Sequence, residues 1–202
     1  MAPKLVLTGF GHFPGVPDNP TQAIVEAFRK DPNGLAQPHK LALLDVAYRS
    51  AGSMVDALLD PAPDALVLTG YSNRATMVTL EARATDYCAP DQPDICGTIP
   101  PLKSDPAPPL TTSAPLASLS TALKEASIAA EISQDAGAYL CNYTYRHALE
   151  RVNERALDTT VLFAHLPALE DTELAKDAAG KISMADAKRA VCLIGTMLTS
   201  KG

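Results

Sequence analysis

The sequence predicts an α/β fold in which helices pack on a mostly parallel sheet. Short apolar runs, typical of buried strands, alternate along the chain with longer segments in which apolar residues recur at helical spacing. Glycines and prolines stand at the ends of many of these runs and mark the turns between them. A strand, a helix and a second strand form a crossover unit, and repeated units build a parallel sheet with helices on its faces.

Three of these strands are expected in the N-terminal third of the chain. Residues 4–8 form an apolar run that ends at Gly9, as expected of a buried strand. Asn19 and Pro20 then begin a helix, because an Asn side chain caps free backbone N–H groups and Pro suits the first helical position. That helix is expected to end near residue 29. The next expected elements are a strand at 40–46, a helix at 50–59 and a strand at 65–69 before Gly70.

The remainder of the chain continues this alternation around one irregular segment. Residues 86–115 contain eight of the 17 prolines, and this density excludes a long helix or a central strand. We expect this Pro-rich excursion to lie on the surface, as a candidate partner contact or lid. The other expected elements are strands at 77–84, 129–132 and 159–164 and helices at 116–126, 143–156 and 183–198, the last with Ser183 as its cap.

Length and charge exclude several classes of protein. A chain of 202 residues fits one domain with a large core, which we expect to span residues 1–202. The net charge of -6 and the dispersed Lys and Arg residues argue against nucleic acids or acidic membranes as partners. Met1 leads almost directly into the first strand, and no apolar segment is long enough to span a bilayer. We therefore expect no signal peptide and no membrane anchor.

The four cysteines predict neither a metal site nor an oxidising compartment. They are Cys88, Cys96, Cys141 and Cys192, and they form no C-x-x-C pair and no zinc-like spacing with histidine. A disulfide between Cys88 and Cys96 stays open, although nothing else indicates secretion. The protein is therefore expected to be cytoplasmic, with free thiols and no bound metal.

Cys141 is a candidate nucleophile. It lies between a turn that contains Gly137 and the helix expected over residues 143–156. A thiol at a helix N-terminus meets the positive end of the helix dipole, which favours the nucleophilic thiolate. The free N–H groups there can also stabilise an oxyanion. The alternative is a structural cysteine that packs as a small hydrophobe.

His165 and Glu81 are candidate partners of that thiol. His165 follows the strand at 159–164, and active-site residues of such sheets gather at the carboxyl ends of strands. A histidine there can take a proton from a thiol and return it to a leaving amine. Glu81 follows an apolar run and could orient the imidazole. The alternatives are a histidine with a structural role and a solvent-facing Glu81 paired with Arg83, which the local sequence of Glu81 alone favours.

The glycine-rich segment after the first strand indicates a pocket. A dinucleotide-binding fingerprint fails here, because its third glycine would fall at Pro14. Phe10 and Phe13 instead place two aromatic rings at the carboxyl end of the strand, which is typical of a small apolar pocket. Ordinary packing that anchors the loop is the alternative reading.

Taken together, these segments resemble the pyroglutamyl peptidase I family of cysteine peptidases, also called pyrrolidone-carboxylate peptidases. Residues 7–13 (LTGFGHF), followed by Asn-Pro-Thr at 19–21, look like the opening signature of the family. Residues 135–142 (DAGAYLCN) resemble its nucleophile segment, and residues 163–167 (FAHLP) resemble its histidine segment. The segment from Gly70 has the length expected in the family and ends on an acidic residue at Glu81. The resemblance covers almost the whole chain.

The resemblance implies a fold, a reaction and a set of site residues. The implied fold is a three-layer α/β/α sandwich, without a cofactor, that often assembles into homodimers or homotetramers. Cys141 would be the nucleophile, His165 the general acid and base, and Glu81 its orienting carboxylate. The substrate would be a peptide with an N-terminal pyroglutamate. Phe10 and Phe13 would flank its lactam ring, and Tyr71, Tyr139 and Leu140 would border the same pocket.

The chain also departs from the family near the expected site. The family has Gln where Tyr71 stands, Thr near the position of Asp45, and an Arg near the position of Asp91. An acidic side chain in place of that Arg would weaken oxyanion stabilisation if it pointed inward. Two alternatives therefore stay open: a related cysteine amidase that cleaves another small acyl group, and a non-catalytic binding protein on the same scaffold.

Overall fold

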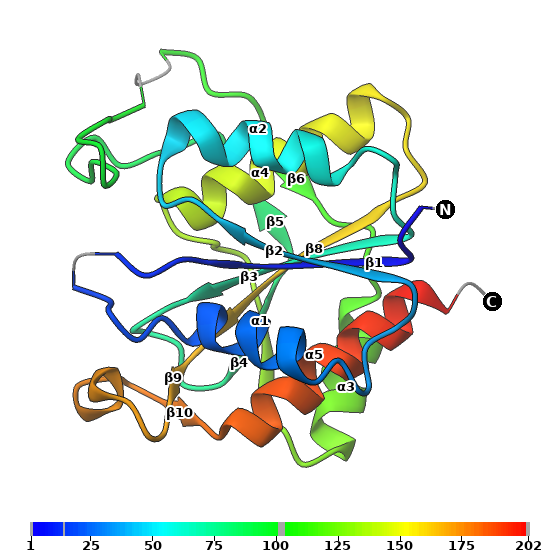
Figure 1. Ribbon diagram of the computed structural model, residues 1–202. Coiled ribbons are helices and arrows are strands. Elements are labelled where there is room, and N and C mark those ends of the chain that lie inside the picture. The colour runs from blue at the N-terminus through cyan, green and yellow to red at the C-terminus, as the bar shows by residue number, and fades with distance from the viewer. Residues whose placement is uncertain (1, 14, 101–103, 201–202) are drawn as a thin grey trace.

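The protein is a sandwich of a central sheet between two layers of helices, as the computed structural model shows (Figure 1). The structure describes residues 2–13, 15–100 and 104–200. Pro14 of the first loop and residues 101–103 of the Pro-rich excursion lie outside the described residues. The predicted three-layer α/β/α architecture is confirmed.

The central sheet has six strands in the order β2-β1-β3-β8-β4-β7. Neighbouring strands are parallel throughout except for β4, which runs antiparallel to β8. The carboxyl ends of β1, β3 and β8 therefore meet at one edge of the sheet, and β4 starts at that edge. The strands are β1 (Leu5–Phe10), β2 (His39–Leu44), β3 (Ala65–Tyr71), β4 (Val78–Glu81), β7 (Ala130–Ser133) and β8 (Thr160–Leu166).

In the described part of the chain, five α-helices cover the two faces of the sheet. One face carries α1 (Pro20–Lys30), α3 (Leu116–Glu125) and α5 (Met184–Thr199), and the other carries α2 (Tyr48–Leu58) and α4 (Leu140–Glu154) (Figure 1). Side chains of β1 point alternately into the two apolar clusters, with Leu5 and Leu7 in one and Val6 in the other. Burial on both faces explains why the strands read as continuous apolar runs.

Short elements complete the chain. They are β5 (Arg83–Ala84), β6 (Leu110–Thr111), β9 (Ala168–Leu169), β10 (Lys181–Ile182) and a 3-10 helix, η1 (Glu173–Lys176). Strand β6 lies within the Pro-rich excursion and pairs with β5. The remainder of the described excursion before α3 has no regular element, as its proline content predicts.

The two predicted helix caps are confirmed. The Asn19 side chain accepts a hydrogen bond from the Thr21 N–H at 3.0 Å, and Pro20 opens α1. The Ser183 hydroxyl accepts one from the Asp186 N–H at 3.0 Å at the start of α5. Each cap satisfies an amide that has no partner within the helix.

The structure corrects three boundaries that affect the site. Helix α4 begins at Leu140, so Cys141 lies inside its first turn. Strand β8 continues to Leu166, so His165 belongs to the strand, because pairing with β3 persists up to Pro167. The single strand expected at 77–84 is two strands. The Ala82 N–H bonds to the Ser133 carbonyl, and the chain then leaves the sheet to pair with β6.

Candidate active site

Cys141 lies in the first turn of α4, where the backbone offers hydrogen-bond donors. The preceding turn contains Gly137 at a φ of +85°, a conformation that glycine adopts without strain. Tyr139 is the N-cap residue, and its side chain makes no capping hydrogen bond. The first amides of a helix have no acceptor within the helix, so these groups are available beside the thiol. The side chain of Cys141 is half-buried, which leaves the sulfur a path to a substrate.

Gly70, in β3, permits the close approach of Cys141 to the sheet. A Cβ atom placed on Gly70 would lie 2.9 Å from Cys141 Sγ and 2.7 Å from Phe163 Cζ. Both distances are shorter than a normal van der Waals contact. The thiol therefore occupies space that any larger residue at position 70 would fill.

His165 faces Gly70 across the pairing of β3 with β8 and contacts both other members of the predicted triad. Its Nδ1 lies 2.7 Å from Glu81 Oε1. The Cys141 thiol lies close enough for its charge and hydrogen-bonding capacity to raise the pKa of the imidazole. Because Glu81 occupies Nδ1, Nε2 is the ring nitrogen left to act on Cys141. The imidazole also packs against the Phe163 ring, with 4.8 Å between ring centroids.

Glu81 is held at the end of β4, where only 1% of its surface is exposed. The alternative of a solvent-facing ion pair with Arg83 is wrong, because Arg83 Nε donates instead to the Gln134 carbonyl at 2.8 Å. The backbone carbonyl of Glu81 accepts a hydrogen bond from the Tyr145 hydroxyl at 2.8 Å. Tyr145 belongs to α4, the helix that carries Cys141, so this bond joins α4 to the end of β4 at Glu81.

These contacts determine the charge of the imidazole. Burial by itself lowers the pKa of His165, but the charge and hydrogen bond of Cys141 and those of Glu81 outweigh it and raise the pKa to about 10. The ring is therefore an imidazolium at neutral pH, between two groups that favour its charge.

The predicted pocket residues lie near this group of side chains. Phe10, Leu140 and the half-buried Phe13, Tyr139 and Cys141 belong to one apolar cluster on the α2–α4 face of the sheet. Tyr71 follows Gly70 at the end of β3, and its partial burial raises the pKa of its hydroxyl. The structure thus places Phe10, Phe13, Tyr139 and Leu140, which come from separate segments of the sequence, in the same apolar cluster as Cys141.

Asn142 is a contributor that the sequence analysis did not select. Its side chain accepts a hydrogen bond from the Thr85 N–H at 2.8 Å and donates to the carbonyls of Thr85 and Tyr87 at 3.0 and 2.9 Å. It therefore binds the segment that follows Glu81 to the first turn of α4. No local signal could have selected it, because an Asn just before a helix expected from residue 143 is an ordinary capping residue.

Two of the departures from the family pattern are at exposed positions. The side chains of Asp45 and Asp91 are exposed to solvent. The condition under which Asp91 would weaken oxyanion stabilisation, an inward-pointing carboxylate, is therefore not met.

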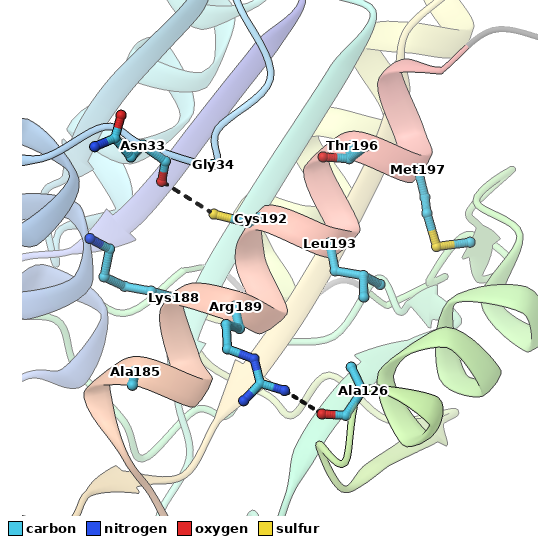
Figure 2. A pocket seen from close by; sticks show the side chains of 10 residues that line it. All are labelled: Asn33, Gly34, Ala126, Ala185, Lys188, Arg189, Cys192, Leu193, Thr196 and Met197. Carbon is cyan, nitrogen blue, oxygen red and sulfur yellow. Dashed lines mark hydrogen bonds between the residues drawn. The ribbon is translucent and has the colours of Figure 1, made fainter.

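A groove of about 720 Å³ lies on the opposite helical layer, along α5 (Figure 2). Cys192, Leu193 and Met197 of α5 line it, and Arg189 reaches across to the Ala126 carbonyl. None of its lining residues belongs to the group around Cys141. Among the described residues, no cluster of His, Cys, Asp and Glu could hold a metal ion. Within the same residues, no helix combines the length and apolar character needed to cross a bilayer.

A contacting cysteine, histidine and carboxylate on an α/β/α scaffold is an arrangement typical of thiol-dependent hydrolases. Comparison with known proteins gives the family. The chain belongs to the pyroglutamyl peptidase family, whose model matches residues 3–197.

Individual relatives agree with this assignment. The pyrrolidone-carboxylate peptidase of Deinococcus radiodurans is 34% identical over 172 residues, which are 82% of this chain and 78% of that protein. The pyrrolidone-carboxylate peptidase of Thermococcus onnurineus is 28% identical and covers 86% of this chain and 88% of its own. The pyroglutamyl peptidase I of Bacillus amyloliquefaciens has the same fold, with a TM-score of 0.86 at 22% identity over 100% of this chain and 97% of that chain.

Proposed function

We propose that this protein is a cysteine peptidase that removes an N-terminal pyroglutamyl residue from peptides. Membership of the family supports the reaction. The observation that carries the proposal is the chain of contacts from Cys141 through His165 to the buried Glu81. A binding protein has no need of that combination, and family membership favours pyroglutamate over another small acyl group.

The reaction proceeds through a thioester. The Cys141 thiolate attacks the carbonyl carbon of the pyroglutamyl residue and forms a tetrahedral oxyanion. His165 gives its Nε2 proton to the amine of the leaving peptide as the C–N bond breaks, and the pyroglutamyl group stays on sulfur. Water then attacks the thioester and loses a proton to His165, and the pyroglutamate leaves with the carboxylate oxygen that the water supplied. These steps restore the thiolate and the imidazolium, and they need no cofactor.

Glu81 and the first turn of α4 support these steps. Glu81 accepts a hydrogen bond from the Nδ1–H of His165, which directs Nε2 at the sulfur and stabilises the imidazolium. The amides at the start of α4 act on the oxyanion, together with the positive end of the helix dipole.

The substrate pocket in this proposal is the apolar cluster beside the thiol. Phe10 and Phe13 flank the lactam ring, and Tyr139, Leu140 and Tyr71 border it. The pyroglutamyl end of a peptide carries no charge, so an apolar pocket with a few polar contacts suits it. Loss of one aromatic wall is expected to cost about 1–3 kcal/mol of discrimination between substrates.

The proposal also covers assembly and location. The chain acts as one catalytic domain over residues 1–202, as a homodimer or homotetramer in the cytoplasm. The acidic net charge and the cysteines present as thiols support a cytoplasmic location. Sedimentation velocity on the purified protein tests the assembly, and a single monomeric species would contradict that part.

Turnover of a pyroglutamyl fluorogenic amide tests the central reaction. Wild type should release the fluorophore, and Cys141→Ala should release none above background. Cys192→Ala is the matched control, because it removes a half-buried thiol on the opposite helical layer and should keep full activity. A folded wild-type protein without turnover would refute the proposed function.

A further inference from the structure

The Pro-rich excursion carries a buried carboxylate that binds three backbone amides. Asp94 is 6% exposed. Its Oδ2 accepts a hydrogen bond from the Tyr48 N–H at 2.8 Å. Its Oδ1 accepts bonds from the Cys96 and Thr98 N–H groups at 2.9 and 2.8 Å. Burial raises the pKa of Asp94, but these three amide bonds outweigh it and hold the pKa below its ordinary value. Asp94 is therefore ionised, and both of its oxygens accept hydrogen bonds.

Asp94 caps α2 from a distant part of the chain. Tyr48 is the first residue of α2, and Ala47, at the N-cap position, has no side chain able to accept a hydrogen bond. The carboxylate of Asp94 supplies that acceptor, and its negative charge lies at the positive end of the α2 dipole. The same hydrogen bond also fixes the loop, because it ties Asp94 to the first residue of α2.

The segment around Asp94, residues 93–98, is joined to the nucleophile turn as well. The Ile95 N–H bonds to the Val46 carbonyl at 3.2 Å, just before α2. The Tyr139 hydroxyl donates to the Pro93 carbonyl at 3.2 Å. Tyr139 is the N-cap residue of α4, two positions before Cys141. The segment thus bridges the starts of α2 and α4, at the edge of the sheet where the triad lies (Figure 1).

The two tyrosines that residues 93–98 contact, Tyr48 and Tyr139, also pack against each other. Tyr48 is 5% exposed, and its ring packs edge-on against Tyr139, with 5.8 Å between centroids. Asp94 holds the backbone of Tyr48, and Pro93 holds the hydroxyl of Tyr139. A shift of residues 93–98 would therefore move both rings, including the one expected to border the substrate pocket.

We propose that Asp94 is a positioning residue for substrate binding, which acts by fixing residues 93–98 and, through them, the Tyr48–Tyr139 pair. The inference rests on the proposed pyroglutamyl peptidase function, because Tyr139 borders the pocket in that proposal. Asp94 touches neither Cys141 nor His165 in the contacts described, so its effect falls on substrate affinity more than on the chemical step.

The test compares KM and kcat for a pyroglutamyl fluorogenic amide across three variants. Asp94→Ala removes all three amide bonds and should raise KM about tenfold while kcat changes less than about threefold. Asp94→Asn should be intermediate, because its remaining oxygen can keep Cys96 and Thr98 but its NH2 group cannot accept from Tyr48. Asp91→Asn is the matched control, an exposed acid in the same excursion, and should match wild type.

Thermal melting separates this role from a purely structural cap. A lower melting temperature for Asp94→Ala with unchanged KM would overturn the inference, and so would a loss confined to kcat. If Asp94→Ala does not fold, Tyr139→Phe keeps the ring and the Asp94 bonds but removes the link to Pro93, and should raise KM about threefold. Unchanged KM in both Tyr139→Phe and Asp94→Asn also overturns it. Absence of turnover in wild type would instead refute the underlying function.

Discussion

Replacing Gly70 with alanine tests how tightly the nucleophile depends on the strand beneath it. The new Cβ would lie 2.9 Å from Cys141 Sγ and 2.7 Å from Phe163 Cζ. Atoms in contact are ordinarily about 3.5–4.0 Å apart, so the thiol must move by roughly 0.6–1.1 Å. Movement of the Phe163 ring gives no relief, because that ring packs against His165.

The expected loss follows from this displacement. A misplacement of about 1 Å in a catalytic geometry costs about 100-fold in rate, which corresponds to about 2.7 kcal/mol of transition-state stabilisation. Overpacking should lower the free energy of unfolding by about 1–3 kcal/mol. At about 2–4 °C per kcal/mol for a chain of this length, the variant should remain folded at 25 °C. We therefore expect kcat/KM to fall about 100-fold in a folded protein.

The assay is release of the fluorophore from a pyroglutamyl amide, with circular dichroism to confirm the fold. Gly195→Ala is the matched control, since its Cβ would lie 2.7 Å from Leu5 Cδ2 on the opposite face of the sheet. It imposes a similar steric load away from the thiol and should leave kcat/KM unchanged. If a folded Gly70→Ala variant kept activity within threefold of wild type, the placement of Cys141 against Gly70 in the active enzyme would be refuted.

Three further predictions concern the triad and its supports. Burial lowers the pKa of His165, but Cys141 and Glu81 outweigh burial and raise that pKa from 6.5 to about 10. Protonated His165 therefore adds to the free energy of unfolding fully below pH 6.5, and this contribution is lost as pH rises to about 10. Urea titrations should show this decline in wild type, and an equal decline in His165→Gln would contradict it. Glu81→Gln should lower kcat about 10²- to 10⁴-fold with little change in KM, and near-normal kcat would contradict its orienting role. Tyr145→Phe removes the bond to the Glu81 carbonyl and should cost about 1–3 kcal/mol of stability in urea unfolding, whereas unchanged stability would show that the bond contributes nothing.

The parts of the fold with local signals could be predicted from the sequence. The caps at Asn19 and Ser183 depend on residues within three positions of the helix start, so the sequence alone identifies them. The position of Cys141 at the start of α4 was predicted to within a few residues, because the preceding turn contains a glycine.

The features that were missed depend on contacts between distant segments. Glu81 taken alone favoured a solvent-facing pair with Arg83, because its actual partner, His165, lies 84 residues further along the chain. The antiparallel direction of β4 is set by its pairing with β8, and no local pattern encodes that direction. The cap of α2 comes from Asp94, 46 residues away, so the sequence around Ala47 contains no sign of it.

The most direct test of the central claim is to trap the acyl-enzyme. Wild-type protein is mixed with a pyroglutamyl amide, quenched in acid during turnover and mapped by peptide mass spectrometry. The account predicts a pyroglutamyl thioester on Cys141, and it predicts neither adduct nor turnover in Cys141→Ala. A pyroglutamyl adduct on a different residue, or continued turnover by Cys141→Ala, would contradict it.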